Sequence, residues 1–340
     1  MLNHNEVEKI LPPIVNYKPY LTANLYGAFN IIENKYGVRL NKIAAVSWRH
    51  GWRIESSVYN EVSSVVEVGE WHYGTHLVTN EEEAQLVNSN PRYIGRAVAV
   101  GLPYAYVLRS ENRIKRRKGS LLIMPPHGIN EEYSFRGSYF ENIQKQSKEF
   151  SYICVCINDV DFKKGEMNKL CEKYGLDYVR GAVSNDKNAL YRMRNLFEYF
   201  EYVTTPVLGS HIVYAAATGA KVSVYLEQND CYVIEDYKLH PWYWNAKWYS
   251  NQSKKLGLLN HKIFKNKWPW LYVEPIQAIE NTNWALDEIG HGQIGNYEEL
   301  LSYTRVTVRS IISGFRALVR KIAQKLILLV INKRLRILGF

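Results

Sequence analysis

The strongest constraint on the fold is a regular alternation of short apolar runs with helical stretches between residues 119 and 226. The runs are GSLLIMPP (119–126), SYICVCIN (151–158), LDYVRGAV (176–183), EYVTTP (201–206) and AKVSVYL (220–226). Helical segments are expected near 137–150, 163–174 and 187–200, and again after the fourth run. Strands that alternate with helices in this way predict a parallel sheet wrapped by helices. We therefore expect a Rossmann-like α/β domain with five strands.

A similar but less regular α/β pattern precedes it. We expect a helix near 21–36 and strands at 41–48, 62–69 and 96–103. Between the two patterns lies VLRSENRIKRRKG (107–119), which is polar and basic, lacks apolar periodicity and therefore predicts a linker. The predicted domains are 1–114, 115–300 and a C-terminal helix at 301–340, and aromatic segments after 227 are expected to cross back and brace both domains. The predicted fold class is α/β, with two Rossmann-like domains facing a cleft.

The turn after the fourth strand, TTPVLGSH (204–211), is the first candidate site. Ligands of open parallel sheets bind beyond the carboxyl ends of the strands, where the chain turns into a helix. Gly209 permits close backbone approach, Ser210 is expected to be the N-cap, and the free N–H groups of the helix start favour an anion such as a phosphate. The candidate donor-binding residues here are Thr204, Thr205, Gly209, Ser210 and His211. The alternative is an ordinary capped helix with a buried histidine.

Other strands of the same domain end in polar residues as well. PPHG places His127 and Gly128 after the first strand, NDVDF places Asp159 and Asp161 after the second, and Glu227 follows the fifth. His127 is a candidate phosphate donor and Glu227 a candidate ribose acceptor, although a solvated loop position is the alternative for Glu227. The two aspartates are candidates for catalysis or ribose binding, and helix capping is the alternative for at least one of them.

The first domain offers SWRHGWRIE (47–55). A strand is expected to end at Trp48, so that His50 faces the cleft as a candidate base and Glu55 as a candidate catalytic carboxylate. Alternatively, Arg49 and Arg53 pair with Glu55 and the segment is scaffold. EWHYGTH (70–76) is a weaker candidate, because its two histidines lie four apart without an evident third metal ligand nearby.

Cysteine spacing and the N-terminal sequence bear on the compartment. Cys154, Cys156, Cys171 and Cys231 have neither zinc spacing nor a C-x-x-C pair, so we expect reduced core thiols. MLNHNEVEKILPPIV has no basic n-region or apolar h-region, so no secretory signal is expected and the predicted location is the cytoplasm.

Charge is unevenly distributed along the chain. The formal net charge is +10, and nine basic residues but no acidic residue lie between Arg305 and Phe340, so the remaining chain is nearly neutral. Nucleic-acid binding by the body is therefore not expected. Apolar residues in 305–338 recur at three and four, which predicts a basic amphipathic helix too short in apolar sequence to span a bilayer. We expect residues 305–340 to bind the anionic inner face of the cytoplasmic membrane; packing on the body or dimerisation is the alternative.

Several of these segments together resemble a known family. "AVAVGLPYAYVL", "LLIMPPHG", "YICVCINDVDF" and above all "VTTPVLGSHIVYAAATGAKVSVY" are similar to bacterial surface-polysaccharide glycosyltransferases of the GT-B fold. The most similar pattern is in transferases that use CMP-activated ulosonic acids, such as retaining Kdo and pseudaminic acid transferases. The resemblance covers roughly residues 40–230, and its most specific part is the GSH-x-x-Y-A-A segment.

The resemblance implies a nucleotide sugar in the second domain, with its phosphate near the GSH turn and His127, and a capsule or lipopolysaccharide O-antigen glycan, or its lipid-linked form, against the first. It implies no metal and no other cofactor. For a retaining transfer it makes Asp159, Asp161 or Glu55 a candidate nucleophile. A UDP-sugar transferase or epimerase of similar architecture, and a non-catalytic membrane-peripheral assembly protein, are the alternatives.

Overall fold

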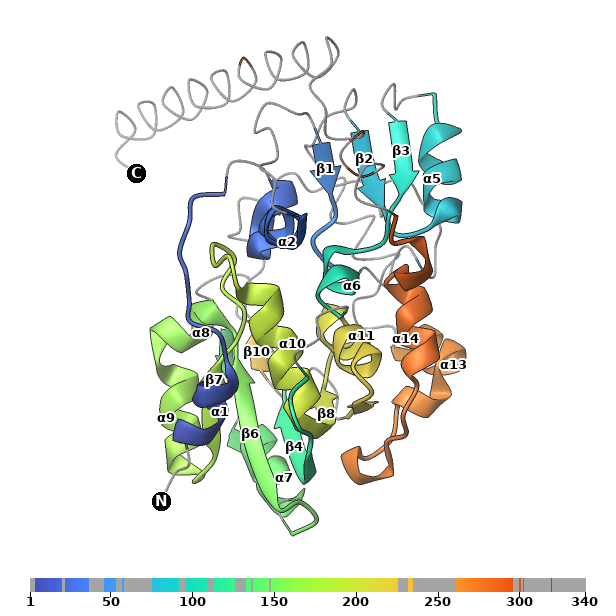
Figure 1. Ribbon diagram of the computed structural model, residues 1–340. Helices are drawn as coiled ribbons and strands as arrows, with labels where there is room; N and C mark the ends of the chain where they lie inside the picture. The colour runs from blue at the N-terminus through green and yellow to red at the C-terminus, as the bar shows by residue number, and fades with distance from the viewer. Residues whose placement is uncertain are drawn as a thin grey trace, which may run out of the picture.

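In the computed structural model a five-stranded parallel sheet forms the larger part of the molecule (Figure 1). Its strands are β4 (Arg117–Ile123), β6 (Tyr152–Ile157), β7 (Asp177–Arg180), β8 (Phe200–Thr205) and β9 (Lys221–Val224), in the order β7-β6-β4-β8-β9. All four strand pairs are parallel. The five predicted strands and their parallel arrangement are confirmed. The strand order reverses between β4 and β8, as in doubly wound α/β sheets.

The structure describes the following residues: 4–19, 22–36, 46–52, 57, 75–91, 96–108, 113–125, 133–135, 137–146, 148–225, 232–234, 261–295, 300, 302 and 319. The expected strand at 62–69 lies outside them. So does the expected amphipathic helix at 305–338, apart from residue 319.

Alternate residues of the large sheet enter different hydrophobic layers. Leu121 and Ile123 pack with α7 (Gly137–Gln146) and α9 (Glu166–Lys173), whereas Leu122 packs with α10 (Ala189–Tyr199) and α11 (Ser210–Ala217). Because successive side chains of a strand point to opposite faces, such a sheet buries apolar residues at every position. The unbroken apolar runs of the sequence follow from this burial on both faces.

Three cysteines contribute to these layers. Cys154, Cys156 and Cys171 are buried free thiols, and burial raises the pKa of Cys156 and Cys171 to about 12. The expectation of reduced core thiols is confirmed for these three, while Cys231 lies outside the described residues.

A second, smaller parallel sheet contains β1 (Val46–Trp48), β2 (Thr75–Val78) and β3 (Arg96–Ala99). Strand β2 was not expected from the sequence, because Thr75 and His76 leave it without a continuous apolar run. The expected helix near 21–36 is interrupted: the 3-10 segment η1 (Thr22–Gly27) has non-helical backbone angles at Leu25 and Tyr26, and the α-helix α2 (Ala28–Tyr36) follows it. Helix α5 (Glu81–Asn88) covers β2 and β3, and the short α6 (Pro103–Val107) leads toward the large sheet (Figure 1).

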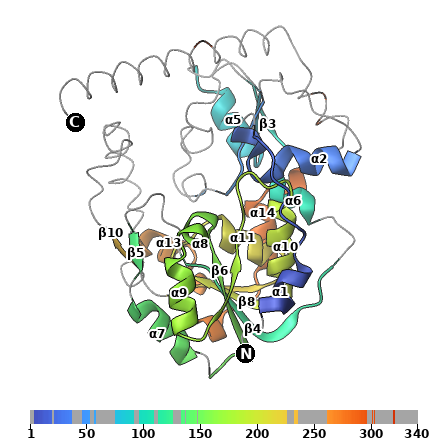
Figure 2. The ribbon, with the colours of Figure 1, turned by 90° about the vertical axis from the view of Figure 1, so that its left-hand side faces the viewer.

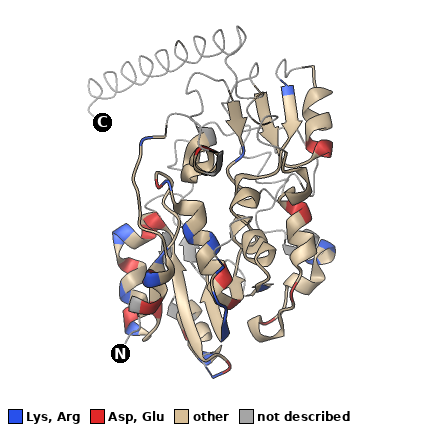
Figure 3. Cartoon of the chain, viewed as in Figure 1, with Lys and Arg blue, Asp and Glu red and all other residues tan. Residues whose placement is uncertain are grey.

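The expected helix near 163–174 is two helices. Gly165, with φ of +79°, ends α8 (Asp159–Lys164) and precedes α9. Lys, Arg, Asp and Glu are mixed on this pair of helices (Figure 3). A two-stranded antiparallel sheet of β5 (Tyr133–Phe135) and β10 (Tyr232–Ile234) was not expected.

The chain crosses between the two sheets at both of its described ends. Helix α1 (His4–Ile10) lies beside α10, and the chain then rises to α2 near the small sheet (Figures 1 and 2). At the other end, α13 (His261–Lys267), η4 (Pro269–Leu271) and η5 (Pro275–Gln277) precede α14 (Thr282–Glu288), which packs on α11. Ile289 follows α14, and its carbonyl accepts a hydrogen bond of 2.9 Å from Leu102 N. The 3-10 turn η6 (His291–Gln293) comes next.

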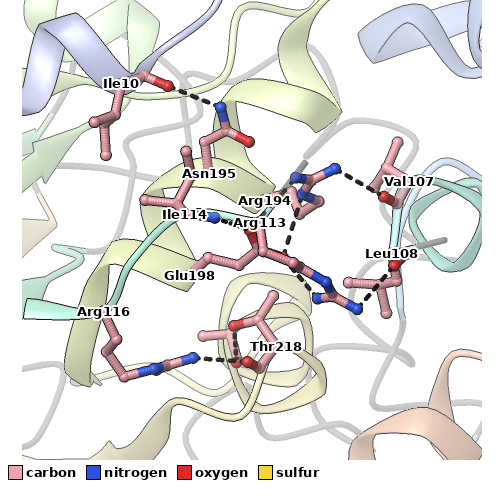
Figure 4. Close-up of polar contacts among 11 residues, drawn as sticks. Ile10, Val107, Leu108, Arg113, Ile114, Arg116, Arg194, Asn195, Glu198 and Thr218 are labelled. Atoms are coloured by element: carbon pink, nitrogen blue, oxygen red, sulfur yellow. Dashed lines mark hydrogen bonds and ion pairs between the residues drawn. The ribbon is translucent and has the colours of Figure 1, made fainter. Parts of the chain in front are cut away.

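The predicted linker makes specific contacts where it enters β4 (Figure 4). Glu198 of α10, 4% exposed, accepts hydrogen bonds from Arg113 at 2.7 Å and from Ile114 N at 3.1 Å. Arg194, also buried, approaches the same carboxylate at 3.3 Å. Arg116 donates to the carbonyl groups of Phe200 and Thr218. The basic residues therefore anchor this segment to α10 and the end of α11.

Replacement of Glu198 tests this anchor. In Glu198→Ala, Arg194 stays buried and loses this carboxylate, so we expect a loss of about 3 kcal/mol in the free energy of unfolding. Urea unfolding followed by circular dichroism measures it. Glu172→Ala on the exposed face of α9 is the matched control and should change stability by less than about 0.5 kcal/mol. Equal effects of the two changes would contradict a stabilising role for the Glu198 network.

Candidate functional site

The candidate site lies at the carboxyl edge of the large sheet, where β4 and β8 end side by side. Ile123 pairs with Thr204 in the parallel register, and Met124 N donates to the Thr204 carbonyl at 2.8 Å. The strand order reverses between these strands, which is where open α/β sheets bind ligands. From β8 the chain turns through residues 206–209 into α11.

The threonine pair at the end of β8 holds the turn. Thr204 is buried and accepts a hydrogen bond of 2.9 Å from the Ser223 hydroxyl on β9. Thr205 is fully buried, and its hydroxyl oxygen accepts from Val207 N at 3.3 Å. Both hydroxyl groups therefore have protein partners and fix the path from β8 to α11.

The N-cap of helix α11 lies one residue earlier than expected. Gly209, in an extended conformation, is the N-cap, and Ser210 is the first helical residue, so the expectation of a Ser210 cap is wrong. The Ser210 hydroxyl instead donates to the Trp52 carbonyl at 3.0 Å. A Cβ atom on Gly209 would lie 3.2 Å from Cε1 of His211, so the imidazole ring would have to shift slightly to accept a side chain there.

The N–H groups at the start of α11 precede its hydrogen-bond ladder. The first helical bonds are donated by Ile212 N and Val213 N to the Gly209 carbonyl. Helices leave their earlier N–H groups without an intrahelical acceptor, and the helix dipole adds a positive partial charge at this end. Gly209, Ser210 and His211 are each half-buried, so this positive end is partly accessible.

The loop after β1 meets α11 from the small sheet. His50 is half-buried, and its carbonyl accepts a hydrogen bond of 3.3 Å from the Tyr214 hydroxyl. A Cβ atom on Gly51 would lie only 2.7 Å from the Ser210 hydroxyl oxygen, so the two segments are in close contact. Ser210 and Tyr214 are four residues apart and share one helix face. This face of α11 therefore joins the carboxyl edges of both sheets.

Arg49, beside His50, has a structural role. Its buried guanidinium pairs with Glu83 of α5 at 2.9 Å and also donates to the Thr79 hydroxyl. Arg49 thus has Glu83 as an ion-pair partner, while the alternative pairing with Glu55 involves a residue outside the described ranges. This ion pair holds the carboxyl end of β1 against α5.

The two aspartates after β6 differ in environment. Neither caps α8, because Asn158 is the N-cap and its side chain accepts from Val160 N at 2.9 Å. The Asp159 carboxylate accepts hydrogen bonds from Lys163 at 2.9 Å and from Arg180 Nε at 2.8 Å. Partial burial raises the pKa of Asp159, but these two cations outweigh it and hold the pKa below its usual value. Asp159 is therefore an ionised, paired carboxylate, whereas Asp161 is buried.

Four candidate residues, Glu55, His127, Gly128 and Glu227, lie outside the described residues. Only part of the EWHYGTH candidate (70–76) lies within the described residues. His76 is buried in β2, while His72 is outside. Within the described ranges, no group of three His, Cys, Asp or Glu side chains is placed to hold a metal ion.

Glu288 and the residues after it extend the site on the α14 side. Trp52 Nε1 donates to the Glu288 carboxylate at 2.6 Å. Gly290, with φ of +65°, packs so closely on the Thr79 carbonyl that a Cβ atom would lie 2.0 Å from it. Glu288 and Tyr214 were not among the residues expected from the sequence. Only Tyr214 carried a usable signal, its four-residue spacing from Ser210.

Comparison of the sequence with known protein families finds no matching family, and comparison with curated proteins finds no significant match. Among the residues that the structure describes, no helix has the length and apolar character needed to cross a membrane.

A double substitution tests the contact between the two sheets. In Gly51→Ala the new methyl group displaces the Ser210 hydroxyl, and in Ser210→Ala that hydroxyl is absent, so each change removes the bond to Trp52 and should cost about 1 kcal/mol. In the double variant, the atom nearest the new methyl group is the Cβ of residue 210, at an ordinary 3.7 Å. The double variant should therefore lose no more stability than one single variant. Additive losses in urea unfolding would contradict the contact.

Proposed function

We propose that the protein is a glycosyltransferase of GT-B type that binds a nucleotide sugar at the start of α11 and an acceptor glycan against the small sheet. One observation carries this proposal. The Ser210 hydroxyl bonds to the Trp52 carbonyl, which brings the anion-favouring start of α11 against the loop that leaves the second parallel sheet. Ligands of parallel sheets bind at such edges, and two facing edges suit a reaction between two substrates.

The chemistry of the donor follows from the start of α11. The N–H end of α11 and its positive partial charge favour a phosphate group. A CMP-sugar has a single phosphate and needs no metal ion to bridge two. Together with the resemblance of the VTTPVLGSHIVYAAATGAKVSVY segment, this supports a CMP-activated ulosonic acid, such as Kdo or pseudaminic acid, as the donor.

The described residues support different roles for the catalytic candidates. His50 lies in the loop that contacts α11 and is the candidate base on the side of the small sheet. Asp159 is paired with Arg180 and Lys163, which favours a role in positioning over nucleophilic attack. Glu55 remains the candidate carboxylate on the side of the small sheet. We propose a bacterial capsule or O-antigen glycan as acceptor, reached at the inner face of the cytoplasmic membrane through residues 305–340.

Nucleotide binding by Ser210 variants tests the proposal. A ligand that binds only the folded protein raises its stability, by about 2.7 kcal/mol at one hundred times the dissociation constant. We expect CMP to raise the unfolding temperature more than CDP, UDP or GDP. Ser210→Asp places a negative charge where the phosphate binds and should abolish this shift. Ser210→Asn has nearly the same shape as that aspartate and loses the same hydroxyl bond to Trp52, but it adds no charge, so it should keep a measurable part of the shift.

Two outcomes of the same assay would contradict the proposal. A preference for UDP would overturn the CMP donor and favour a UDP-sugar enzyme. No shift with any of the four nucleotides would overturn nucleotide-sugar binding and favour a non-catalytic assembly protein. Release of CMP from CMP-Kdo or CMP-pseudaminic acid, measured by chromatography, then tests catalysis. In hydrolysis, water replaces CMP on the anomeric carbon, so CMP and the free sugar should form in equal amounts.

A further inference from the structure

Tyr26 has an unusual backbone conformation for its residue type. Its φ is +59°, and it is the one non-glycine residue with positive φ in the ranges that the structure describes. Gly27 follows with φ of +74°. For a residue with a side chain this conformation costs about 1–2 kcal/mol, and such residues cluster at active sites and ligand-binding turns. Glycine would satisfy the same turn without the cost.

Neighbouring segments hold this turn firmly. Tyr26 N donates to the Ser184 carbonyl at 2.8 Å, and Gly27 N donates to the Tyr17 hydroxyl at 3.0 Å. A Cβ atom on Gly27 would lie 2.3 Å from the Lys187 carbonyl oxygen, so the chain passes directly over residue 187. Ser184 and Lys187 belong to the loop between β7 and α10. The loop between β7 and α10 therefore fixes the position of the Tyr26 backbone.

The side chain of Tyr26 lies at the candidate site. Its ring is half-buried, and its centroid is 5.6 Å from that of the His50 ring. Tyr26 thus joins the loop after β7 of the large sheet to the loop after β1 of the small sheet. Burial raises the pKa of its phenol, and the negative charge of Asp159 raises it further. The hydroxyl group therefore keeps its proton at neutral pH and acts as a hydrogen-bond donor.

We propose that Tyr26 contacts the sugar of the bound nucleotide sugar and donates a hydrogen bond from its hydroxyl group to a sugar oxygen beside His50. This inference rests on the proposed glycosyl transfer. The Tyr26 ring packs against the hydrophobic core and also lies beside the ring of the candidate base, so the strained turn gives the site an aromatic ring and a hydrogen-bond donor next to His50. The nucleotide itself is held by α11, so the contribution of Tyr26 belongs to the transferred group.

Removal of the hydroxyl group alone tests this role. Tyr26→Phe keeps the ring and the strained turn, so its unfolding temperature should match that of the original protein. Its kcat/KM for CMP release from CMP-Kdo or CMP-pseudaminic acid should fall about 10-fold or more, while the unfolding shift with CMP stays unchanged. Tyr178→Phe is the matched control, because the Tyr178 hydroxyl bonds the exposed Glu172 of α9, and it should leave both quantities unchanged.

The possible results separate the two proposals. If the original protein releases CMP and Tyr26→Phe is equally active, the role of Tyr26 is overturned and the proposed function stands. If Tyr26→Phe loses the shift with CMP alone, the hydroxyl contacts the nucleotide and the assignment to the sugar is wrong. If the original protein binds no nucleotide and releases no CMP, the proposed function is wrong and the inference about Tyr26 fails with it.

Discussion

The site depends on one close contact, between the start of α11 and the loop that follows β1. Ser210 and Tyr214 each donate a hydrogen bond to a carbonyl group of that loop, on Trp52 and on His50. The contact requires glycine at position 51, because a larger residue would displace the Ser210 hydroxyl. One helix face therefore positions the candidate base of the small sheet over the anion-favouring helix start of the large sheet.

This contact is supported by a hydrophobic core that both sheets share. Trp48 and Leu77 of the small sheet belong to the same buried cluster as Val203 of β8 and Ile212 of α11. The chain also crosses between the sheets on two sides, through the segment before α2 and through α14. Such a core resists separation of the sheets, because opening would expose apolar surface at about 25 cal/mol per Å². We infer that the relative position of His50 and Ser210 is set by packing and does not depend on a bound ligand.

The parallel sheet was predictable because strands buried on both faces appear in sequence as unbroken apolar runs. Two elements were not: Thr75 and His76 leave β2 without a continuous apolar run, and Gly165 divides a helix whose apolar pattern reads as continuous. The start of α11 was predicted as a site, but its cap was not, because Ser210 bonds to a carbonyl 158 residues away. Tyr26 was missed for the same reason, since a strained φ held by distant loops leaves no local pattern.

The most direct test of the central claim is a crystal structure of the protein with CMP. Our account predicts that the phosphate lies within hydrogen-bond distance of the N–H groups of Ser210 and His211, with the place of the transferred sugar open toward His50 and Tyr26. The account would be contradicted if the phosphate bound elsewhere on the molecule. It would also be contradicted if protein groups covered the start of α11 at saturating CMP.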